Sequence, residues 1–229
     1  MTLALRFDTV VKRYGRRGAP VLAGVDLRVL AGEVVRVTGA NGAGKTTLLR
    51  LAAGLTRPSA GRVERAGRAG WAPDRLDAPP PLTARELLRA LDVPAGEADA
   101  LAHRLGFAAW LDERLAHDST GTLHKVVLAQ ALAGEPALLV LDEPWAGLDD
   151  DARLALAALL DEHRGRGAAL LLSEHGDGPL APDRALEVRD GGLHAADGSR
   201  AAIEVRGTTA AVAALAADAR ARGLEVRER

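Results

Sequence analysis

The chain has 229 residues, of which 48% are hydrophobic and 27% are charged, and its formal net charge is -1. These values are typical of a globular protein and exclude a global electrostatic attraction to nucleic acid or anionic lipid. There is no cysteine, which excludes disulfide bonds and thiolate chemistry. Residues 1–8 lack the apolar stretch of a signal peptide, and no segment approaches the roughly 20 apolar residues of a membrane-spanning helix. We therefore expect any role at a membrane to depend on partner proteins.

The first third of the chain is predicted to be mostly strand. Roughly alternating apolar positions predict strands over residues 3–14 and 21–30, with a polar turn between them. A short β-branched run, residues 33–38, predicts a third strand that ends at a glycine-rich loop. Residues 45–53 then have the composition of a helix, and residues 62–72 predict two short strands around a glycine.

Helices and buried strands alternate in the next part of the chain. After a proline-rich loop, Thr83 and Glu86 form the pattern of a capping box, which predicts a helix that ends near Leu91. Further helices are expected over residues 95–105, 119–133 and 150–164, and strands over residues 137–141, 168–173 and 184–189. Continuous apolar runs predict strands buried on both faces, so this alternation predicts an α/β domain with a largely parallel sheet.

The character of the sequence changes after residue 192. Residues 201–206 and 224–227 predict strands, and residues 209–222 predict an alanine-rich helix. A segment of about 35 residues is too small for a core of its own. We therefore expect a main domain over residues 1–194 and a strand–helix–strand appendage over residues 195–229, packed on the main domain or on a partner.

A phosphate-binding motif follows the third predicted strand. Residues 39–46, Gly-Ala-Asn-Gly-Ala-Gly-Lys-Thr, match G-x-x-x-x-G-K-[ST], in which backbone N–H groups and a helix N-terminus surround phosphate oxygens. Lys45 is expected to reach the β- and γ-phosphates, and the Thr46 hydroxyl to ligate Mg²⁺. The alternative is a glycine-rich turn that happens to contain a lysine, but the flanking strand and helix favour nucleotide binding. The expected nucleotide contacts from this segment are Gly39, Asn41, Gly42, Ala43, Gly44, Lys45, Thr46 and Thr47.

Two acidic residues, Asp142 and Glu143, end the apolar run at residues 138–141. A carboxylate at the end of a buried strand can hold Mg²⁺ and its water shell, and the next carboxylate can orient and deprotonate an attacking water. An acid pair alone is more often a solvated strand end, but the phosphate-binding motif earlier in the chain favours the catalytic interpretation.

Together these motifs resemble the ATP-binding subunits of ABC transporters over about residues 3–194. Residues 142–149, Asp-Glu-Pro-Trp-Ala-Gly-Leu-Asp, resemble the Walker B motif and D-loop of that family. Tyr14 stands where the family stacks an aromatic ring on adenine, and His175, after Leu-Ser-Glu, resembles its switch histidine, which contacts the γ-phosphate. Without the resemblance, these two residues would be an ordinary strand aromatic and a surface histidine.

One residue and one short segment depart from the family pattern. Asp74 stands where the family has a glutamine that contacts Mg²⁺ and the attacking water; its carboxylate can still ligate the ion but adds negative charge beside the triphosphate. Residues 118–122, Asp-Ser-Thr-Gly-Thr, replace the signature Leu-Ser-Gly-Gly-Gln. Ser119 and Gly121, which would face a γ-phosphate, are retained, whereas the changes around them predict reduced function of the site that this segment completes. The alternative is that Asp118 or Ser119 merely caps a helix.

The resemblance implies an ABC-type P-loop NTPase fold with an antiparallel β-lobe near the N-terminus and a helical lobe over about residues 76–133. It implies ATP and Mg²⁺ as cofactors, Lys45, Glu143 and His175 as catalytic residues, and Thr46, Asp74 and Asp142 as metal ligands. The expected partners are transmembrane permease subunits and a second ATPase subunit, with a homodimer favoured over a heterodimer, and no nucleic acid.

The expected function is ATP hydrolysis that drives transport, with export slightly favoured, on the cytoplasmic face of the plasma membrane. A soluble ABC-type ATPase that remodels a non-transport target is the alternative. A GTPase is excluded because no Asn-Lys-x-Asp motif is present, and a small-molecule kinase would leave the D-loop and signature positions unexplained.

Overall fold

The structure, a computed structural model, describes residues 2–15, 18–74, 81–115, 120–174 and 178–196. The chain divides into two compact units, residues 1–196 and 197–229, and the described residues belong to the first. The strands and helix predicted after residue 200 lie outside the described residues. Within the described ranges, no helix combines the length and the apolar content that a membrane span requires.

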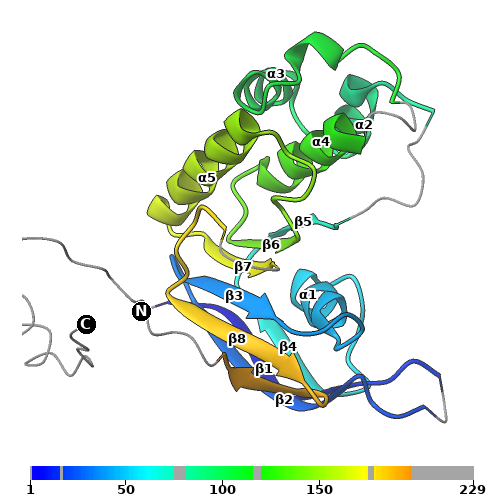
Figure 1. Cartoon of the computed structure of the whole chain (residues 1–229), viewed down its shortest axis with the longest axis vertical. Coiled ribbons are helices and arrows are strands. Elements are labelled where there is room, and N and C mark those ends of the chain that lie inside the picture. The colour runs from blue at the N-terminus through cyan, green and yellow to red at the C-terminus, as the bar shows by residue number, and fades with distance from the viewer. Residues whose placement is uncertain (1, 16–17, 75–80, 116–119, 175–177, 197–229) are drawn as a thin grey trace, which may run out of the picture. The chain divides into compact units, whose positions relative to one another are not determined.

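The first sheet is antiparallel and has three strands in the order β2-β1-β4 (Figure 1). They are β1 (Leu3–Lys12), β2 (Leu22–Leu30) and β4 (Ala60–Arg65). β1 lies in the middle and pairs antiparallel with both neighbours. Its side chains Leu5 and Phe7 are buried, as the alternating apolar pattern predicts. This sheet confirms the predicted antiparallel β-lobe.

The second sheet has six strands in the order β5-β6-β7-β3-β8-β9. Their bounds are β3 (Val34–Thr38), β5 (Ala69–Ala72), β6 (Leu138–Asp142), β7 (Ala169–Ser173), β8 (Arg184–Arg189) and β9 (Gly192–Ala195). The first five in this order pair in parallel, and β9 pairs antiparallel with β8. β9 was not predicted, because it is short, begins at a glycine and has little apolar pattern of its own. The two short strands predicted around Gly67 are present, but they belong to different sheets.

The helices lie close to their predicted positions. Their bounds are α1 (Lys45–Ala53), α2 (Ala84–Ala90), α3 (Ala95–Arg104), α4 (Thr120–Leu132) and α5 (Asp150–Gly165), with a 3₁₀ turn η1 (Ala108–Trp110) after α3. The capping box of α2 is formed as predicted. The Glu86 backbone N–H donates to the Thr83 hydroxyl at 3.1 Å, and the Thr83 N–H donates to the Glu86 carboxylate at 2.9 Å.

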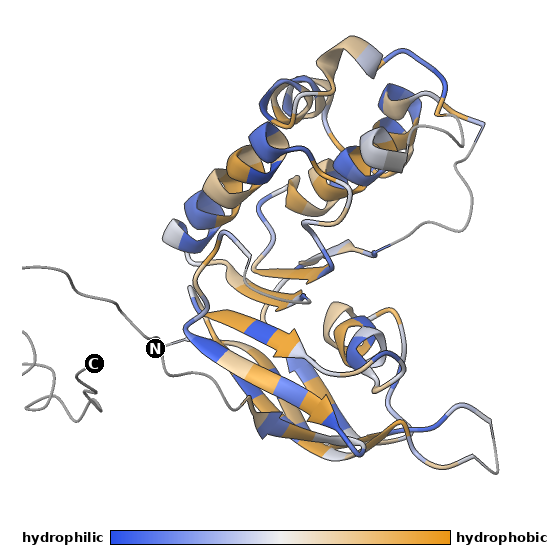
Figure 2. Cartoon of the chain, viewed as in Figure 1, coloured by the Kyte–Doolittle hydropathy of each residue, from blue (hydrophilic) through white to orange (hydrophobic). Residues whose placement is uncertain are grey.

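The central strands β6 and β7 of the six-stranded sheet are buried on both faces, and neighbouring residues of one strand belong to different cores. In β6, Leu139 and Leu141 pack with side chains of α2, α3, α4 and α5, whereas Leu138 and Val140 pack with α1 and the three-stranded sheet. Figure 1 shows these helices on one side of β6 and β7, with α1 and β1 on the other, and Figure 2 shows β6 and β7 as mostly apolar. The carboxyl ends of β3, β6 and β7 therefore meet at one edge of the sheet, between the two cores.

Candidate active site

The loop between β3 and α1 has a backbone conformation that depends on glycine. Gly39, Gly42 and Gly44 have φ angles of 142°, 81° and 113°, in the region that side-chain-bearing residues rarely adopt. At Gly39 a Cβ atom would also lie 2.5 Å from the Val188 carbonyl oxygen, which belongs to the β8 backbone. The glycines of the phosphate-binding motif are thus required by the path of the chain before any ligand is considered.

Lys45 and Thr46 open helix α1 and point toward the loop and the acidic strand end. The Lys45 side chain is 8% exposed, and its ammonium donates to the Gly39 carbonyl at 2.8 Å, so that its charge lies across the loop. The Thr46 hydroxyl donates to the Asp142 carboxylate at 2.7 Å. A phosphate-binding loop, a cation and a hydroxyl–carboxylate pair are therefore adjacent in space.

A cavity of about 360 Å³ lies at this place. Most of the residues predicted for the site line it, namely Asn41, Gly42, Gly44, Lys45, Thr46, Thr47, Asp74, Asp142 and the predicted base Glu143. Hydroxyl and carboxylate oxygens are the ligands that Mg²⁺ prefers, and a glycine-rich loop with a lysine suits phosphate. The residues present therefore fit a nucleotide phosphate chain and its Mg²⁺ ion.

Asp142 is buried, with 4% of its surface exposed, and both of its carboxylate oxygens accept hydrogen bonds. Thr46 donates to one oxygen and the Ser173 hydroxyl donates to the other. The Ser173 hydroxyl also accepts a bond from the Glu143 N–H at 3.1 Å. Ser173 was not predicted to be part of the site, because only the parallel pairing of β6 with β7 places it opposite Asp142.

Glu143 has a φ of 51°, in the left-handed region that only a few per cent of non-glycine residues adopt. Its N–H donates to the Ser173 carbonyl at 3.1 Å as well as to the hydroxyl, and its own carbonyl accepts from the Ala146 N–H at 3.1 Å. This turn interrupts the strand alternation and lets Glu143 line the same cavity as Asp142 and Asp74.

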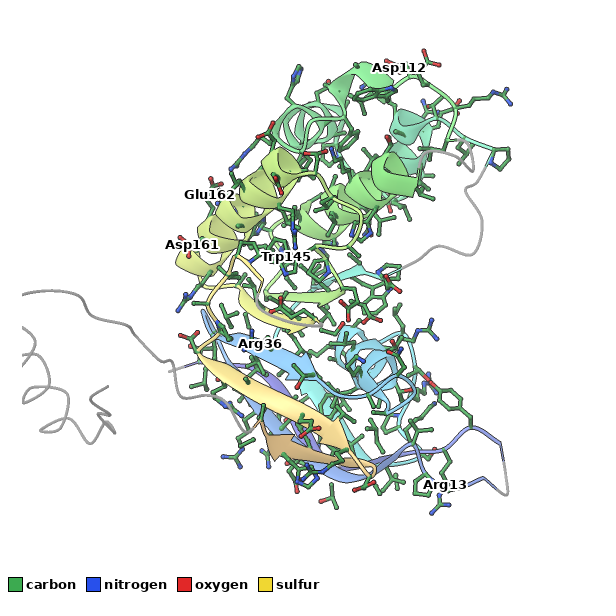
Figure 3. All side chains as sticks on the ribbon, viewed as in Figure 1. Arg13, Arg36, Asp112, Trp145, Asp161 and Glu162 are labelled. Atoms are coloured by element: carbon green, nitrogen blue, oxygen red, sulfur yellow. The ribbon has the colours of Figure 1, made fainter. Side chains whose placement is uncertain are left out.

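Besides Asp142, the carboxyl group of Glu174 is buried, with 4% of its surface exposed, and it lies just beyond the end of β7. Its carboxylate accepts a hydrogen bond from the indole N–H of Trp145 at 3.0 Å. Burial raises the pKa of Glu174, and the negative charge of Glu143 raises it further. The positive charge of Arg36 and the hydrogen bond from Trp145 lower it. Figure 3 shows Arg36 on β3 and Trp145 in the loop that follows β6. Neither Glu174 nor Trp145 was singled out from the sequence.

Helix α4 is tied to the acidic loop by two side chains. The buried His124 ring makes a hydrogen bond to the Pro144 carbonyl at 3.1 Å, and burial lowers the pKa of this histidine, although the charge of Asp74 and that bond act in the opposite direction. The Lys125 ammonium donates to the Asp149 carboxylate at 2.7 Å, and this interaction lowers the pKa of Asp149. The helix that begins at the predicted signature segment thus contacts the 142–149 segment at Pro144 and at Asp149.

Two other predicted residues, Tyr14 and Gly121, lie at the margins of the site. Tyr14 is 53% exposed; its hydroxyl is 3.3 Å from the Thr47 hydroxyl, and the Lys12 ammonium is 5.1 Å from its ring centroid. Gly121 lies at the start of α4, where an added Cβ would be 3.3 Å from the Gly147 carbonyl, and it does not line the cavity. His175 and Ser119 lie outside the described residues, so their predicted contacts are not tested.

Comparison with known proteins identifies the family. A protein-family model described as ABC transporter matches residues 22–146, which include the glycine-rich loop and both acidic residues. The chain belongs to the ABC transporter family. It is 43% identical over 182 residues to the zinc import ATP-binding protein ZnuC of Cereibacter sphaeroides, an alignment that covers 76% of this chain and 73% of that relative.

Solved ABC structures have the same fold. One, of an ATP-binding subunit of an ABC transporter, is 27% identical and has a TM-score of 0.71, covering 98% of this chain and 95% of that one. Another, a post-hydrolysis dimer of the ATP-binding cassette MJ0796 bound to ADP and phosphate, is 22% identical with a TM-score of 0.74, covering 82% of this chain and 96% of that one. The predicted fold and family are confirmed, and this ABC subunit is an ATPase whose ATP hydrolysis is coupled to transport. The slight preference for export finds no support in the zinc import relative.

Proposed function

We propose that this chain drives the uptake of zinc, or of a chemically similar divalent metal ion, through separate membrane-spanning subunits. The observation that supports this most strongly is the 43% identity with a zinc import ATP-binding protein across 182 residues. Relatives from other bacteria that are 39% to 41% identical carry the same name. The metal ion is the cargo in this proposal, and the membrane subunits recognise it.

Binding of ATP is proposed to use the glycine-rich loop and its surroundings. Backbone N–H groups of residues 39–44 and the Lys45 ammonium hold the phosphates, and Tyr14 stacks on the adenine. Thr46 and Asp142, with Asp74 as a third oxygen donor, hold Mg²⁺ directly or through its water shell. When bound, Mg²⁺ neutralises charge on the phosphate oxygens.

Hydrolysis is proposed to use Glu143 as the general base. Its carboxylate lines the cavity, so it can accept a proton from the water that attacks the γ-phosphate, which leaves ADP and phosphate. The bonds from the Glu143 N–H to Ser173 support this role, because they fix the backbone that carries the carboxylate. His175 is proposed to contact the γ-phosphate.

The assembly proposed here has two ATPase subunits in a head-to-tail pair, with a homodimer favoured. Ser119 and Gly121 of one copy would then face the phosphate site of the other. Residues 1–194 would form the ATP-binding domain and residues 195–229 an appendage. The pair would sit on the cytoplasmic side of the plasma membrane, against the permease subunits.

The proposal can be tested by reconstituting the chain in vesicles with the membrane subunits that copurify with it. ATP should drive radioactive zinc across the membrane in the importing direction, and Glu143→Gln should bind ATP normally while its hydrolysis and zinc transport fall by roughly 10²-fold. Wild-type hydrolysis in Glu143→Gln would remove the catalytic assignment. An ATP-hydrolysing complex that moves no zinc, or moves it outward, would refute zinc uptake and leave the ATPase assignment intact.

A further inference from the structure

The loops that follow β6 and β7 start side by side, and a buried hydrogen bond joins them. Asp142 and Ser173 are paired in the parallel register of these strands, so Glu143 and Glu174 are the first residues to leave the sheet. The Glu143 N–H bonds to Ser173, and the Glu174 N–H bonds to the Val37 carbonyl at 3.3 Å. Beyond these points, the Trp145 indole N–H and the Glu174 carboxylate connect the two loops.

This bond is enclosed by the protein. Trp145 is 6% exposed and packs in the core formed with α4 and α5, and Glu174 is buried beside it. The backbone of Gly178 returns over the pair, because an added Cβ there would lie 2.6 Å from the Trp145 indole nitrogen and would also meet the Glu174 carboxylate. A buried hydrogen bond to a carboxyl group is stronger than one in water, and an unpaired partner left behind in such a place is unfavourable.

The bond acts on a strained part of the chain. Glu143, two residues before Trp145, has a left-handed backbone conformation that persists only where surrounding contacts hold it. The turn after it is short, with the Ala146 N–H bonded to the Glu143 carbonyl at 3.1 Å. Anchoring the Trp145 ring therefore fixes the far end of the same turn that aims the Glu143 carboxylate into the cavity.

We propose that Glu174 and Trp145 are positioning residues for Glu143: their hydrogen bond holds the catalytic carboxylate in the orientation that hydrolysis requires. This inference rests on the proposed role of Glu143 as general base. It assigns the Glu174 side chain a supporting role behind the cavity, distinct from the phosphate contact proposed for the next residue, His175. The function of the pair depends on an acceptor oxygen at Glu174 and an N–H donor at Trp145.

Three single substitutions separate these requirements. Trp145→Phe keeps an aromatic ring but removes the donor, Glu174→Leu removes the acceptor, and Glu174→Gln keeps an acceptor oxygen without the charge. In the full-length chain assembled with its membrane subunits, Trp145→Phe and Glu174→Leu should each lower kcat by roughly 10- to 100-fold, the scale of a misplaced catalytic group. The KM for ATP and the affinity for ADP should stay within about twofold, because the phosphate loop is untouched. Glu174→Gln should retain kcat within about threefold.

Two further measurements distinguish positioning from a general loss of structure. The double variant Trp145→Phe/Glu174→Leu should be no slower than the slower of those two single variants, because both remove the same bond. Amide hydrogen exchange of peptides that cover residues 140–150 should be faster in Trp145→Phe and in Glu174→Leu, with or without nucleotide. It should be unchanged in Glu174→Gln.

Several results would overturn the proposal. The bond does not position Glu143 if Trp145→Phe keeps wild-type kcat or if the losses of kcat are additive in the double variant. The same conclusion follows if exchange of residues 140–150 is unchanged in Trp145→Phe and Glu174→Leu, or if Glu174→Gln is as slow as Glu174→Leu. A Glu143→Gln variant measured in parallel separates the two proposals. If it keeps wild-type kcat, the base assignment is wrong; if it is inactive while Trp145→Phe is fully active, only the positioning role is wrong.

Discussion

Ser173→Ala tests how the acidic strand end is held together. The Ser173 hydroxyl is completely buried and makes two bonds, one donated to the Asp142 carboxylate and one accepted from the Glu143 N–H. The substitution removes both bonds and adds no atom that could replace them. The Glu143 N–H keeps its bond to the Ser173 carbonyl, so the main loss falls on one oxygen of Asp142.

The size of the effect follows from the burial of Asp142. A hydrogen bond to a charged group contributes about 1.5 to 3 kcal/mol, and the Thr46 hydroxyl still satisfies the other carboxylate oxygen. We therefore expect the free energy of unfolding to fall by about 2 kcal/mol. For a chain of this size, about 1 kcal/mol lowers Tm by roughly 2 to 4 °C, so Tm should fall by roughly 4 to 8 °C.

Calorimetric unfolding of the full chain without nucleotide measures this change. Ser59→Ala is a matched control, because its hydroxyl also accepts a backbone N–H bond, from Arg13 at 3.0 Å, but at an exposed position. That control should change the free energy of unfolding by no more than about 0.5 kcal/mol. Equal Tm values for Ser173→Ala and Ser59→Ala would show that the Ser173–Asp142 bond contributes nothing to stability, and the argument for a rigid acidic strand end would fail.

Two other predictions follow from the loop and from the helical core. Gly39→Ala should weaken ATP binding at least about tenfold, because its Cβ would collide with the Val188 carbonyl. Gly42→Ala is the control, because its φ is also left-handed but no described atom lies within 4 Å of its Cβ. Equal losses of ATP affinity in the two variants would refute a steric cause. Burial lowers the pKa of His163, so its neutral form is favoured in the folded state, and the free energy of unfolding should decrease as pH falls below about 6.5, the pKa of an unfolded histidine. His163→Gln should reduce this decrease between pH 7 and pH 5 in denaturant titrations, whereas the exposed His103→Gln should not; an unchanged pH dependence in His163→Gln would contradict the assignment.

Much of the site could be predicted from the sequence because its residues lie in short, contiguous motifs. The glycine-rich loop with Lys45 and Thr46, and the pair Asp142 and Glu143, each follow an apolar strand directly. In a largely parallel sheet, the carboxyl ends of β3 and β6 lie at the same edge although β7 separates them, so local patterns were sufficient to predict that these groups share one site. The capping box at Thr83 was predictable for the same reason, since both of its bonds join residues three positions apart.

The residues that sequence analysis missed depend on contacts between distant segments. Ser173 reaches Asp142 only because β6 and β7 are paired in a particular register, and Trp145 reaches Glu174 across 29 positions of the chain. Neither serine nor tryptophan carries a recognisable chemical pattern at these places. The left-handed turn at Glu143 was equally hidden, because glutamate has no preference for that conformation and surrounding contacts impose it.

The strand that carries the acidic pair has leucine or valine at every position before Asp142, and both of its faces are buried. Where only one face of a strand is buried, a slip of one residue moves apolar side chains into water, and this penalty specifies the alignment. In β6 such a slip would exchange one apolar face for another at little hydrophobic cost. What a slip cannot preserve is the match of Asp142 with Ser173 and Thr46, because a carboxylate displaced into either apolar layer would lose its partners. The polar groups of the site thus also specify the register of β6. Variants that remove them should therefore be examined for misaligned strand pairing as well as for lost ATP turnover.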